Sequence, residues 1–433
     1  MPGKTLLMKR SAVLAPIVLG VLLGAASAQT ETALYSFCAK AKCADGFGPP
    51  AGLTFDQKGN LYGTTGAGGA GKDCPPSYTG CGVVFKLTPE GKETVLYSFC
   101  AQSRCADGAN PYAGLAIDQK GNMYGTTYSG GAHNDAGVLF KLTPEGKETV
   151  LYSFCARGGE FCTDGAKPDA GLVLDQKGNL YGTAVEGGAY EGGVVFKVTP
   201  EGKETVLYSF CAQFSCADGA APLAGLIFDR KGNLYGTTFE GGDGSGQPGV
   251  VFKLTPGGKE TVLYSFCTQE NCADGAVPLA GLIFDQKGNL YGTTFGGGVP
   301  INNCTYQQKG CGVVFKLTPK GKETVLYTFC AQTTDCADGA GPRAGLVFDQ
   351  KGDLYGTTIY GGAYASGYYG GGVVFKLTPR GKETVLHAFC EHENCSDGAG
   401  PGAGLIFDQK GNLYGTTGGG GAHNGGVVFK LTP

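Results

Sequence analysis

The feature that most constrains this chain is a unit of about 60 residues that recurs seven times and covers most of the sequence. The most recognisable segment of the unit reads LYSFC in its commonest form, and its cysteines are Cys38, Cys100, Cys155, Cys211, Cys267, Cys330 and Cys390. Successive copies start 55 to 63 residues apart. Self-similarity at such a period is typical of solenoids and propellers, in which each unit packs against its neighbours. The fold is therefore expected to consist of seven equivalent units.

Each unit contains four short segments with the composition of β-strands. In the fourth unit they are residues 226–228, 234–238, 250–255 and 261–266. Asp229 and Gly232 bracket the first connection, which is the pattern of a tight hairpin with a left-handed glycine. Gly236, inside the second strand, predicts the close approach of a neighbouring backbone. Four antiparallel strands repeated seven times indicate an all-β fold, a seven-bladed β-propeller.

The two ends of the sequence complete each other. The last unit stops at Thr432 and Pro433, where the others continue into a fourth strand, and residues 32–37 are a fourth strand without the first three. An open array would leave two bare sheet edges, which favour aggregation. We therefore predict that residues 33–37 pair antiparallel with residues 427–431 and close the ring. The predicted domain is a single propeller over residues 29–433, with repeats near 53–100, 115–155, 172–211, 226–267, 282–330, 346–390 and 405–433 plus 32–38.

Residues 1–28 have the pattern of a secretory signal peptide. Lys4, Lys9 and Arg10 precede an apolar run that is too short to span a bilayer, and residues 26–28 (ASA) offer a cleavage site. The chain carries a formal net charge of −3, which provides no basic surface for nucleic acid or anionic lipid. We therefore predict a secreted protein, extracellular or periplasmic, that neither binds nucleic acid nor inserts into a membrane.

The repeat resembles a known family. The pattern AGLIFDQKGNLYGTT, then GG, then GVVFKLTP-x-GKETVLYSF, is similar to the GloVer tandem repeat of bacterial secreted and surface proteins, and the resemblance covers all seven units. It implies an extracytoplasmic bacterial propeller, which in some members carries a sorting anchor at the C-terminus. This sequence shows no such anchor after its last repeat. The resemblance implies no established activity and no functional residues.

The eighteen cysteines fall into nine local pairs. Seven pairs follow the fourth strands and two lie in the longest loops of the first and fifth units: Cys38/Cys43, Cys100/Cys105, Cys155/Cys162, Cys211/Cys216, Cys267/Cys272, Cys330/Cys336, Cys390/Cys395, Cys74/Cys81 and Cys304/Cys311. An even count, close spacing and a secretion signal predict disulfides rather than thiolate metal ligands. Each bridge closes a short loop and is worth only about 2 kcal/mol, so its main role is to pin an exposed loop. No metal site and no cofactor are predicted.

Departures from the repeat point to function in a chain whose units are so alike. They concentrate in the loops between second and third strands, which share one face of a propeller with the cysteine loops between blades. We call this the top face. The candidate ligand-binding residues are Tyr78, Tyr306, Asn303, His133, His423, Glu186, Glu240 and Tyr364. Tyrosine and asparagine on pinned loops suit carbohydrate or protein binding, since tyrosine offers contact area at low entropic cost. Ordinary loop variation without a ligand is the alternative.

Three further features allow two interpretations each. The bridges Cys74–Cys81 and Cys304–Cys311 belong to blades that lie nearly opposite in a ring of seven. They indicate either a ligand site between two preorganised loops or protection of long loops from proteolysis. The Asp-Gly aspartates form either a carboxylate ring that holds a cation at the channel mouth or caps of their own turns. These are Asp45, Asp107, Asp164, Asp218, Asp274, Asp338 and Asp397. His387 replaces a repeated tyrosine and is interpreted as a tolerated strand substitution rather than a ligand.

Two function classes stay open. The first is a non-enzymatic binding or scaffold module for an extracellular glycan or a surface protein. The second is a polysaccharide-active hydrolase or lyase, in which Glu186, Glu191 and Glu240 place carboxylates across a sugar, or His133 and His423 supply a base. The sequence contains no triad signature, metal motif or phosphate loop, so no catalytic residue is assigned.

Overall fold

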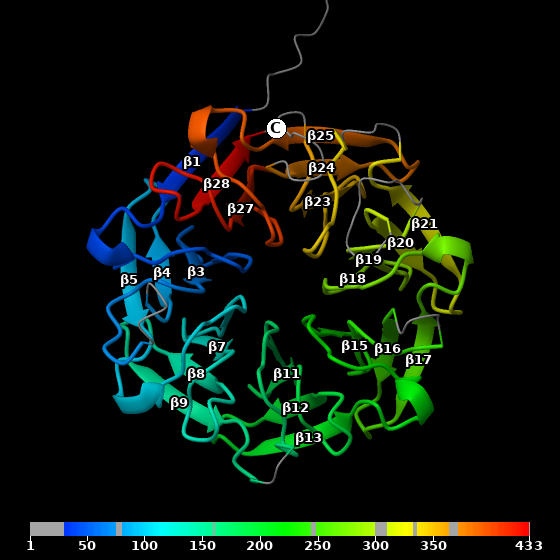
Figure 1. Ribbon diagram of the computed structural model, residues 1–433, viewed down its shortest axis with the longest axis horizontal. Coiled ribbons are helices and arrows are strands. Elements are labelled where there is room, and N and C mark those ends of the chain that lie inside the picture. Colours follow the sequence, from blue (N-terminus) through cyan, green and yellow to red (C-terminus); the bar gives the residue numbers. More distant parts are fainter. Residues whose placement is uncertain are drawn as a thin grey trace, which may run out of the picture.

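Each repeat folds into one antiparallel sheet because its four apolar runs are joined by turns that glycine and proline keep tight. Gly232 has a φ of +79°, and its N–H donates to the Asp229 carbonyl at 3.1 Å, as expected for the first hairpin of a blade. The computed structural model describes residues 30–74, 80–158, 161–243, 248–298, 310–331, 336–362 and 371–432. It shows seven four-stranded sheets arranged in a ring (Figure 1). The predicted all-β, seven-bladed propeller is confirmed.

The strands of each blade run in order from the channel outward, and blades 1 to 7 are numbered by their innermost strands. These innermost strands are β2 (Thr54–Phe55), β6 (Ala116–Ile117), β10 (Val173–Leu174), β14 (Ile227–Phe228), β18 (Ile283–Phe284), β22 (Val347–Phe348) and β26 (Ile406–Phe407). The second strands are β3 (Leu61–Thr65), β7 (Met123–Thr127), β11 (Leu180–Ala184), β15 (Leu234–Thr237), β19 (Leu290–Thr294), β23 (Leu354–Thr358) and β27 (Leu413–Thr417).

The outer two positions follow the same plan. The third strands are β4 (Val83–Leu87), β8 (Val138–Leu142), β12 (Val194–Val198), β16 (Val250–Leu254), β20 (Val313–Leu317), β24 (Val373–Leu377) and β28 (Val427–Thr432). The outermost strands are β5 (Glu93–Ser98), β9 (Glu148–Ser153), β13 (Glu204–Ser209), β17 (Glu260–Ser265), β21 (Glu323–Thr328), β25 (Glu383–Ala388) and β1 (Thr30–Ser36). The third strands are almost entirely buried, because each packs between the two neighbouring blades.

The ring closes through the two ends of the chain, as predicted. Strand β1 pairs antiparallel with β28, with Ala33 opposite Phe429 and Ser36 opposite Val427 (Figure 1). The Phe37 N–H extends the pairing by donating to the Gly426 carbonyl at 2.9 Å. Blade 7 therefore takes its outermost strand from the beginning of the chain, and β28 is paired on both sides instead of being left as a bare edge.

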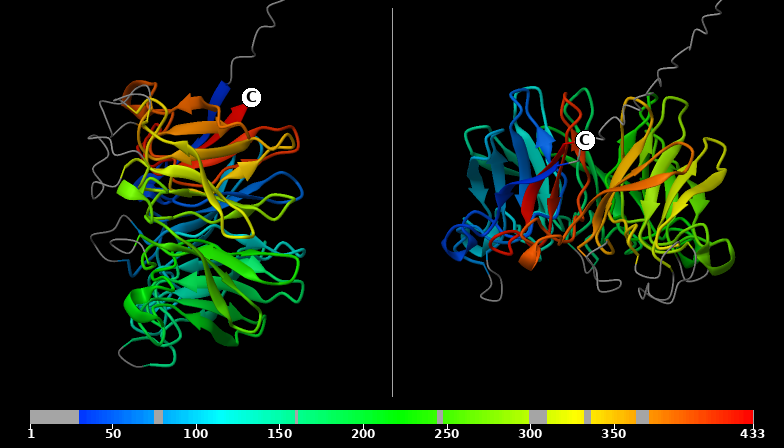
Figure 2. Two further views of the ribbon diagram at one scale, coloured as in Figure 1. Left: turned by 90° about the vertical axis from the view of Figure 1, so that its right-hand side faces the viewer. Right: turned by 90° about the horizontal axis from the view of Figure 1, so that it is seen from above.

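The cysteine loops and the loops between second and third strands share the top face, as expected. The two sets of loops are hydrogen-bonded to each other; for example, Gly69 N donates to Cys43 O at 2.9 Å. Short 3-10 turns mark the cysteine loops on one side of the ring (Figure 2): η1 (Ala41–Cys43), η2 (Ser103–Cys105), η3 (Phe214–Cys216), η4 (Glu270–Cys272) and η6 (Glu393–Cys395). Within the described ranges, no helix is long and apolar enough to cross a membrane.

The glycine inside each second strand is required by a phenylalanine side chain of the same blade. The expectation that a neighbouring backbone approaches Gly236 is therefore wrong. A Cβ atom on Gly236 would lie 2.8 Å from Cζ of Phe252 and 2.9 Å from Cδ2 of Leu226. Both neighbours belong to the same blade, and Phe252 is the cross-strand partner of Gly236. The crowding therefore comes from a buried phenylalanine ring lying over the glycine rather than from a neighbouring backbone.

We expect Gly236→Ala to lower the free energy of unfolding by about 1–3 kcal/mol, because the added methyl group overpacks a filled core. Gly257→Ala in the same blade is the matched control, since a methyl group added there would have no neighbouring atom within 4 Å. That variant should stay within about 0.5 kcal/mol of wild type. Urea unfolding followed by circular dichroism measures both changes. Equal stability of the two variants would contradict the packing argument.

Candidate functional site

The structure describes only some of the residues predicted to bind a ligand. His133, His423, Glu186 and Glu240 lie exposed on top-face loops between second and third strands. Tyr78, Asn303, Tyr306 and Tyr364 lie outside the described residues, as do Cys304 and the signal segment 1–28. The proposed site between the two stapled loops therefore stays a prediction.

The described cysteines form the predicted local bridges. The disulfides are Cys38–Cys43, Cys74–Cys81, Cys100–Cys105, Cys155–Cys162, Cys211–Cys216, Cys267–Cys272, Cys330–Cys336 and Cys390–Cys395. No free cysteine occurs in the part of the chain that the structure describes.

The Asp-Gly aspartates act as caps against the outermost strands. The carboxylate of Asp107 accepts hydrogen bonds from the Ala101 and Gln102 N–H groups and from the Tyr97 hydroxyl at 2.8–3.0 Å. In blade 6 the tyrosine is replaced by His387, whose Nε2 lies 3.4 Å from Asp397 Oδ2. Burial holds the pKa of His387 below its ordinary value. Because Tyr97 belongs to an outermost strand, Asp107 lies far from the channel, which favours the capping interpretation over a cation-binding ring.

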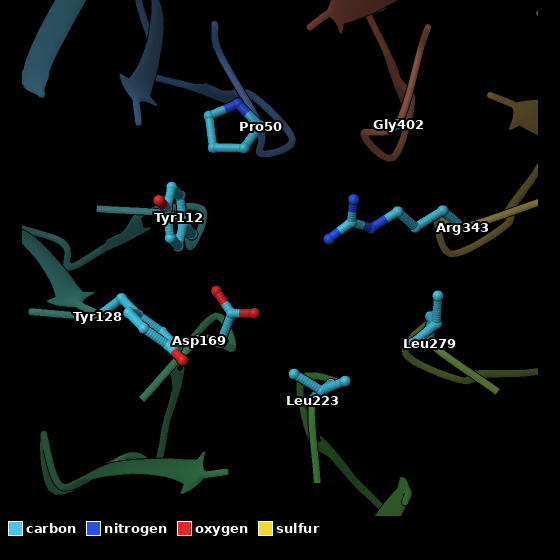
Figure 3. A pocket seen from close by; sticks show the side chains of 8 residues that line it. All are labelled: Pro50, Tyr112, Tyr128, Asp169, Leu223, Leu279, Arg343 and Gly402. Carbon is cyan, nitrogen blue, oxygen red and sulfur yellow. The ribbon is translucent and has the colours of Figure 1, made fainter. Parts of the chain in front are cut away.

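A cavity lies at the mouth of the central channel. Its volume is about 640 Å³. Its lining residues are Pro50, Tyr112, Tyr128, Asp169, Leu223, Leu279, Arg343 and Gly402 (Figure 3). Seven of these residues, all except Tyr128, occupy one equivalent position: each follows the proline that precedes an innermost strand. We call this set the mouth ring. Each blade thus contributes one mouth-ring residue to a shared cavity.

The repeat holds each mouth-ring residue in a rigid frame. The residue before the proline has a left-handed backbone even where it is β-branched, as at Val277 with a φ of +62°. The alanine after the mouth-ring residue is anchored by the preceding blade, since Thr293 Oγ1 donates to Ala344 O at 3.1 Å. The same bond joins Thr126 to Ala170 at 3.3 Å. The mouth-ring side chain therefore varies between blades on a backbone that stays the same.

The walls of the cavity differ around the ring. Asp169 and Arg343 face it from opposite sides, and Leu223 and Leu279 form an apolar wall between them (Figure 3). Tyr112 lies next to Asp169, and its ring is 5.7 Å from that of Tyr128. On the remaining side, Gly402 and Pro50 add little bulk. The cavity therefore combines one cation, one carboxyl group, an aromatic pair and an aliphatic wall.

Asp169 is an unusual aspartate in this protein. Burial raises its pKa to about 6, and the positive charge of Arg343 opposes the rise only in part. Asp175 in the same blade shows the reverse: burial works against its charge, but hydrogen bonds from Asn179, Lys177 and Tyr181 hold its pKa below the ordinary value. Among the described residues, Asp169 has no hydrogen-bond donor and no cation within 4.0 Å. Its carboxylate faces the cavity uncompensated.

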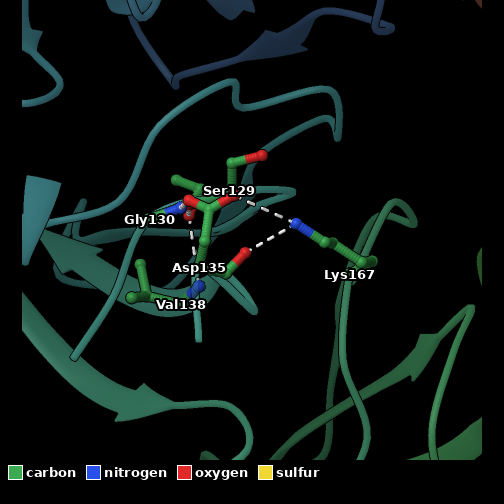
Figure 4. A network of polar contacts seen from close by, with 6 residues as sticks. Ser129, Gly130, Asp135, Val138 and Lys167 are labelled. Atoms are coloured by element: carbon green, nitrogen blue, oxygen red, sulfur yellow. Dashed lines mark hydrogen bonds and ion pairs between the residues drawn. The ribbon is translucent and has the colours of Figure 1, made fainter. Parts of the chain in front are cut away.

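A polar network behind the aromatic pair fixes Tyr128. Lys167 Nζ donates to Asp135 O at 2.6 Å and lies 3.2 Å from Asp135 Oδ2 (Figure 4). The same ammonium group lies 5.1 Å from the centre of the Tyr128 ring. Burial raises the pKa of Tyr128, and the nearby Glu186 and Asp169 charges add to the effect. Of the described residues predicted from sequence, Glu186 is therefore the one with an electrostatic influence on the cavity wall.

The mouth ring was missed in the sequence because variation was sought only in the longer loops. The signal is nevertheless present. In segments such as DGAKPDAGL, DGAVPLAGL and DGAGPRAGL, the flanking Pro, Ala, Gly and Leu repeat while the residue after the proline changes. The residue before the proline changes as well, and two variable positions inside a repeated segment are easily overlooked beside loops that also vary in length.

The chain belongs to the Gloeobacter/Verrucomicrobia repeat family, which matches residues 18–163, 77–307 and 302–433. It resembles the extracellular domain of a hybrid two-component system protein from B. thetaiotaomicron, with 11% identity, a TM-score of 0.53 and 92% of this chain covered. PorZ, a surface component of the type-IX secretion system of Porphyromonas gingivalis, is similar at 12% identity, with a TM-score of 0.50 and 88% coverage. This chain spans 39% and 46% of those two proteins, respectively. At such identities the likeness shows the propeller fold alone. A comparison with curated protein sequences gives no match.

The raised pKa of Asp169 can be tested by measuring how the stability of the protein depends on pH. Because its pKa is raised from 3.8 to about 6, the folded state holds the proton more tightly than the unfolded state. Wild-type stability should therefore fall as the pH rises from about 4 to about 6. We expect Asp169→Asn to match wild type near pH 4 and to exceed it by about 1–3 kcal/mol at pH 8.

Asp175→Asn is the matched control for this test. Its carboxylate is stabilised by hydrogen bonds, so the substitution should lower stability at pH 8. Urea titrations at both pH values measure the differences. A loss of stability in Asp169→Asn at pH 8 would show that Asp169 has a favourable partner in the folded protein.

Proposed function

We propose that this protein is a secreted, non-enzymatic binding module that holds its ligand at the mouth ring. One observation carries the proposal: the position that differs most between otherwise repeated segments is the position that lines a shared cavity of about 640 Å³. A scaffold alone would not need a different side chain at this position in nearly every blade. Concave cavities lined by apolar groups and a few convergent polar groups are the usual form of ligand sites.

Several observations support action outside the cytoplasm. Disulfide bonds persist in oxidising compartments, and the described chain holds eight of them. One similar propeller is an extracellular domain and another is a bacterial surface component. An extracellular glycan or a surface protein remains the expected class of partner.

The hydrolase alternative receives less support from the cavity. Glycoside hydrolysis commonly uses two carboxyl groups on either side of the scissile bond. Asp169 is the one carboxyl group among the described residues that line the cavity, while Glu186 and Glu240 lie exposed on loops of blades 3 and 4. The described geometry therefore favours binding over hydrolysis.

Exchanging residues between blades tests the site without disturbing the fold. Arg343→Gly installs the residue of blade 7, and Asp169→Leu installs the residue of blades 4 and 5. Arg230→Gln is the matched control, because it gives blade 4 the glutamine that the other blades carry in their first hairpin. Wild type and variants would be screened by thermal shift and calorimetry against oligosaccharides, short peptides and small metabolites.

We expect at least one ligand whose affinity falls tenfold or more in Arg343→Gly or Asp169→Leu, a loss of about 1.4 kcal/mol, and is unchanged in Arg230→Gln. If Tyr78→Ala and Tyr306→Ala lower the affinity for a ligand and the two mouth-ring variants do not, the ligand binds at the stapled loops rather than at the mouth ring. A panel with no ligand weakened by the mouth-ring exchanges would contradict the proposal.

A further inference from the structure

The ligand's chemistry can be inferred from the charges of the mouth ring. We propose that the mouth ring binds a zwitterion, in which an amine faces Asp169, a carboxylate faces Arg343, and an apolar body lies against Leu223, Leu279 and Tyr112. This inference rests on the proposed function, because it assigns a ligand class to the same cavity.

Two opposite charges face the cavity without neutralising each other. Asp169 and Arg343 form no ion pair within 4.0 Å, and no hydrogen bond joins either side chain to another described residue. Yet they are close enough for the Arg343 charge to act on the Asp169 carboxyl. A largely buried carboxylate without a partner costs stability, and a ligand cation placed beside it would recover that cost.

Asp169 differs from the carboxylates that belong to the repeated scaffold. Unpartnered carboxylate oxygens also occur between blades, for example Oε1 of Glu148 and Oε1 of Glu260. Those glutamates recur at the first position of the outermost strand in blades 1 to 6, so they belong to the repeat. Asp169 occurs once, in a position where the other blades carry proline, tyrosine, leucine, arginine or glycine. It is a feature of the cavity rather than of the fold.

The part of the cavity between the two charged side chains is lined by apolar groups. Leu223 and Leu279 are adjacent around the ring, on the arc that runs from Asp169 to Arg343. Tyr112, with 38% of its surface exposed, covers the side next to Asp169 and is backed by Tyr128. An apolar body would remove these side chains from water, whereas a strongly hydroxylated one would leave them without complementary contacts. A cation alone or an anion alone would contact only one of the two charged side chains.

A homologous series of ω-amino acids provides a test that measures charge separation directly. Affinities of wild type for chains from 3-aminopropanoate to 8-aminooctanoate, and for di- and tripeptides with free termini, would be measured by calorimetry at pH 7.5. Matched n-alkylamines and n-alkylcarboxylates supply ligands with one charge. We expect an optimum chain length and at least tenfold weaker binding of either single-charge analogue, since each charge-assisted contact contributes separately.

The variants assign each end of the ligand. Arg343→Gly should weaken binding of the zwitterion and of the alkylcarboxylate but not of the alkylamine. Asp169→Asn should weaken binding of the zwitterion and of the alkylamine but not of the alkylcarboxylate. Affinity for the zwitterion should also rise between pH 5 and pH 7 in wild type, as Asp169 with its pKa of about 6 loses its proton, and stay flat in Asp169→Asn. Preference for peptides over ω-amino acids would identify a peptide terminus as the source of the zwitterion.

Other outcomes would overturn the inference in distinguishable ways. If a neutral or uronic oligosaccharide binds and is weakened by Arg343→Gly while no zwitterion binds, the ligand class is wrong and the mouth-ring site stands. If zwitterions bind equally to wild type and both variants, the site itself is elsewhere, and the proposed function fails with it.

Discussion

Edge-to-face contacts between phenylalanines hold the ring together at every seam between blades. The phenylalanine that ends one outermost strand packs on the third-strand phenylalanine of the next blade, as Phe210 packs on Phe252 with ring centres 5.0 Å apart. The seam at the chain ends uses the same contact, between Phe37 and Phe85 at 4.9 Å. Such pairs contribute about 0.5–1.5 kcal/mol beyond the burial of their area. Because each phenylalanine directly precedes a cysteine loop, the seam also fixes where the following segment crosses toward the channel.

This constraint divides the top face into fixed and variable parts. The capped cysteine loop leads to the proline, and the alanine two residues later is bonded to a threonine of the preceding blade, as in Thr126 to Ala170. Between these anchors, a mouth-ring side chain can change without altering the backbone. A preformed cavity loses less entropy on binding than one that must be ordered by its ligand. The repeated residues therefore build the fold, and the unrepeated ones decide what the cavity recognises.

The fold could be predicted from the sequence because its determinants are local and repeated. Turn residues such as Asp229 and Gly232 fix the hairpins, and the complementary ends fix closure. The cavity could not be predicted in the same way, since radial position is a property of the assembled ring. The local sequence marks Asp169 as a variable residue in a repeated segment, but it does not show that Asp169 lies beside the channel while Glu240 lies on an exposed loop. The neighbour of Gly236 was misjudged for a similar reason: crowding was evident, but which group caused it depends on packing across the strands.

A sevenfold scaffold with identical side chains at its mouth would suit a ligand with rotational symmetry, such as an ion on the axis. This protein breaks the symmetry at the position that lines the cavity at the channel mouth. The mouth-ring residues of blades 7 and 1, Gly402 and Pro50, are small. The charged residues Asp169 and Arg343 belong to blades 3 and 6, which lie nearly opposite each other. The resulting field across the cavity has a direction, and complementary charge patterns act mainly on specificity and orientation rather than on affinity. A ligand with two unlike ends can therefore enter in a single preferred orientation, which a symmetric ring of carboxylates would not impose.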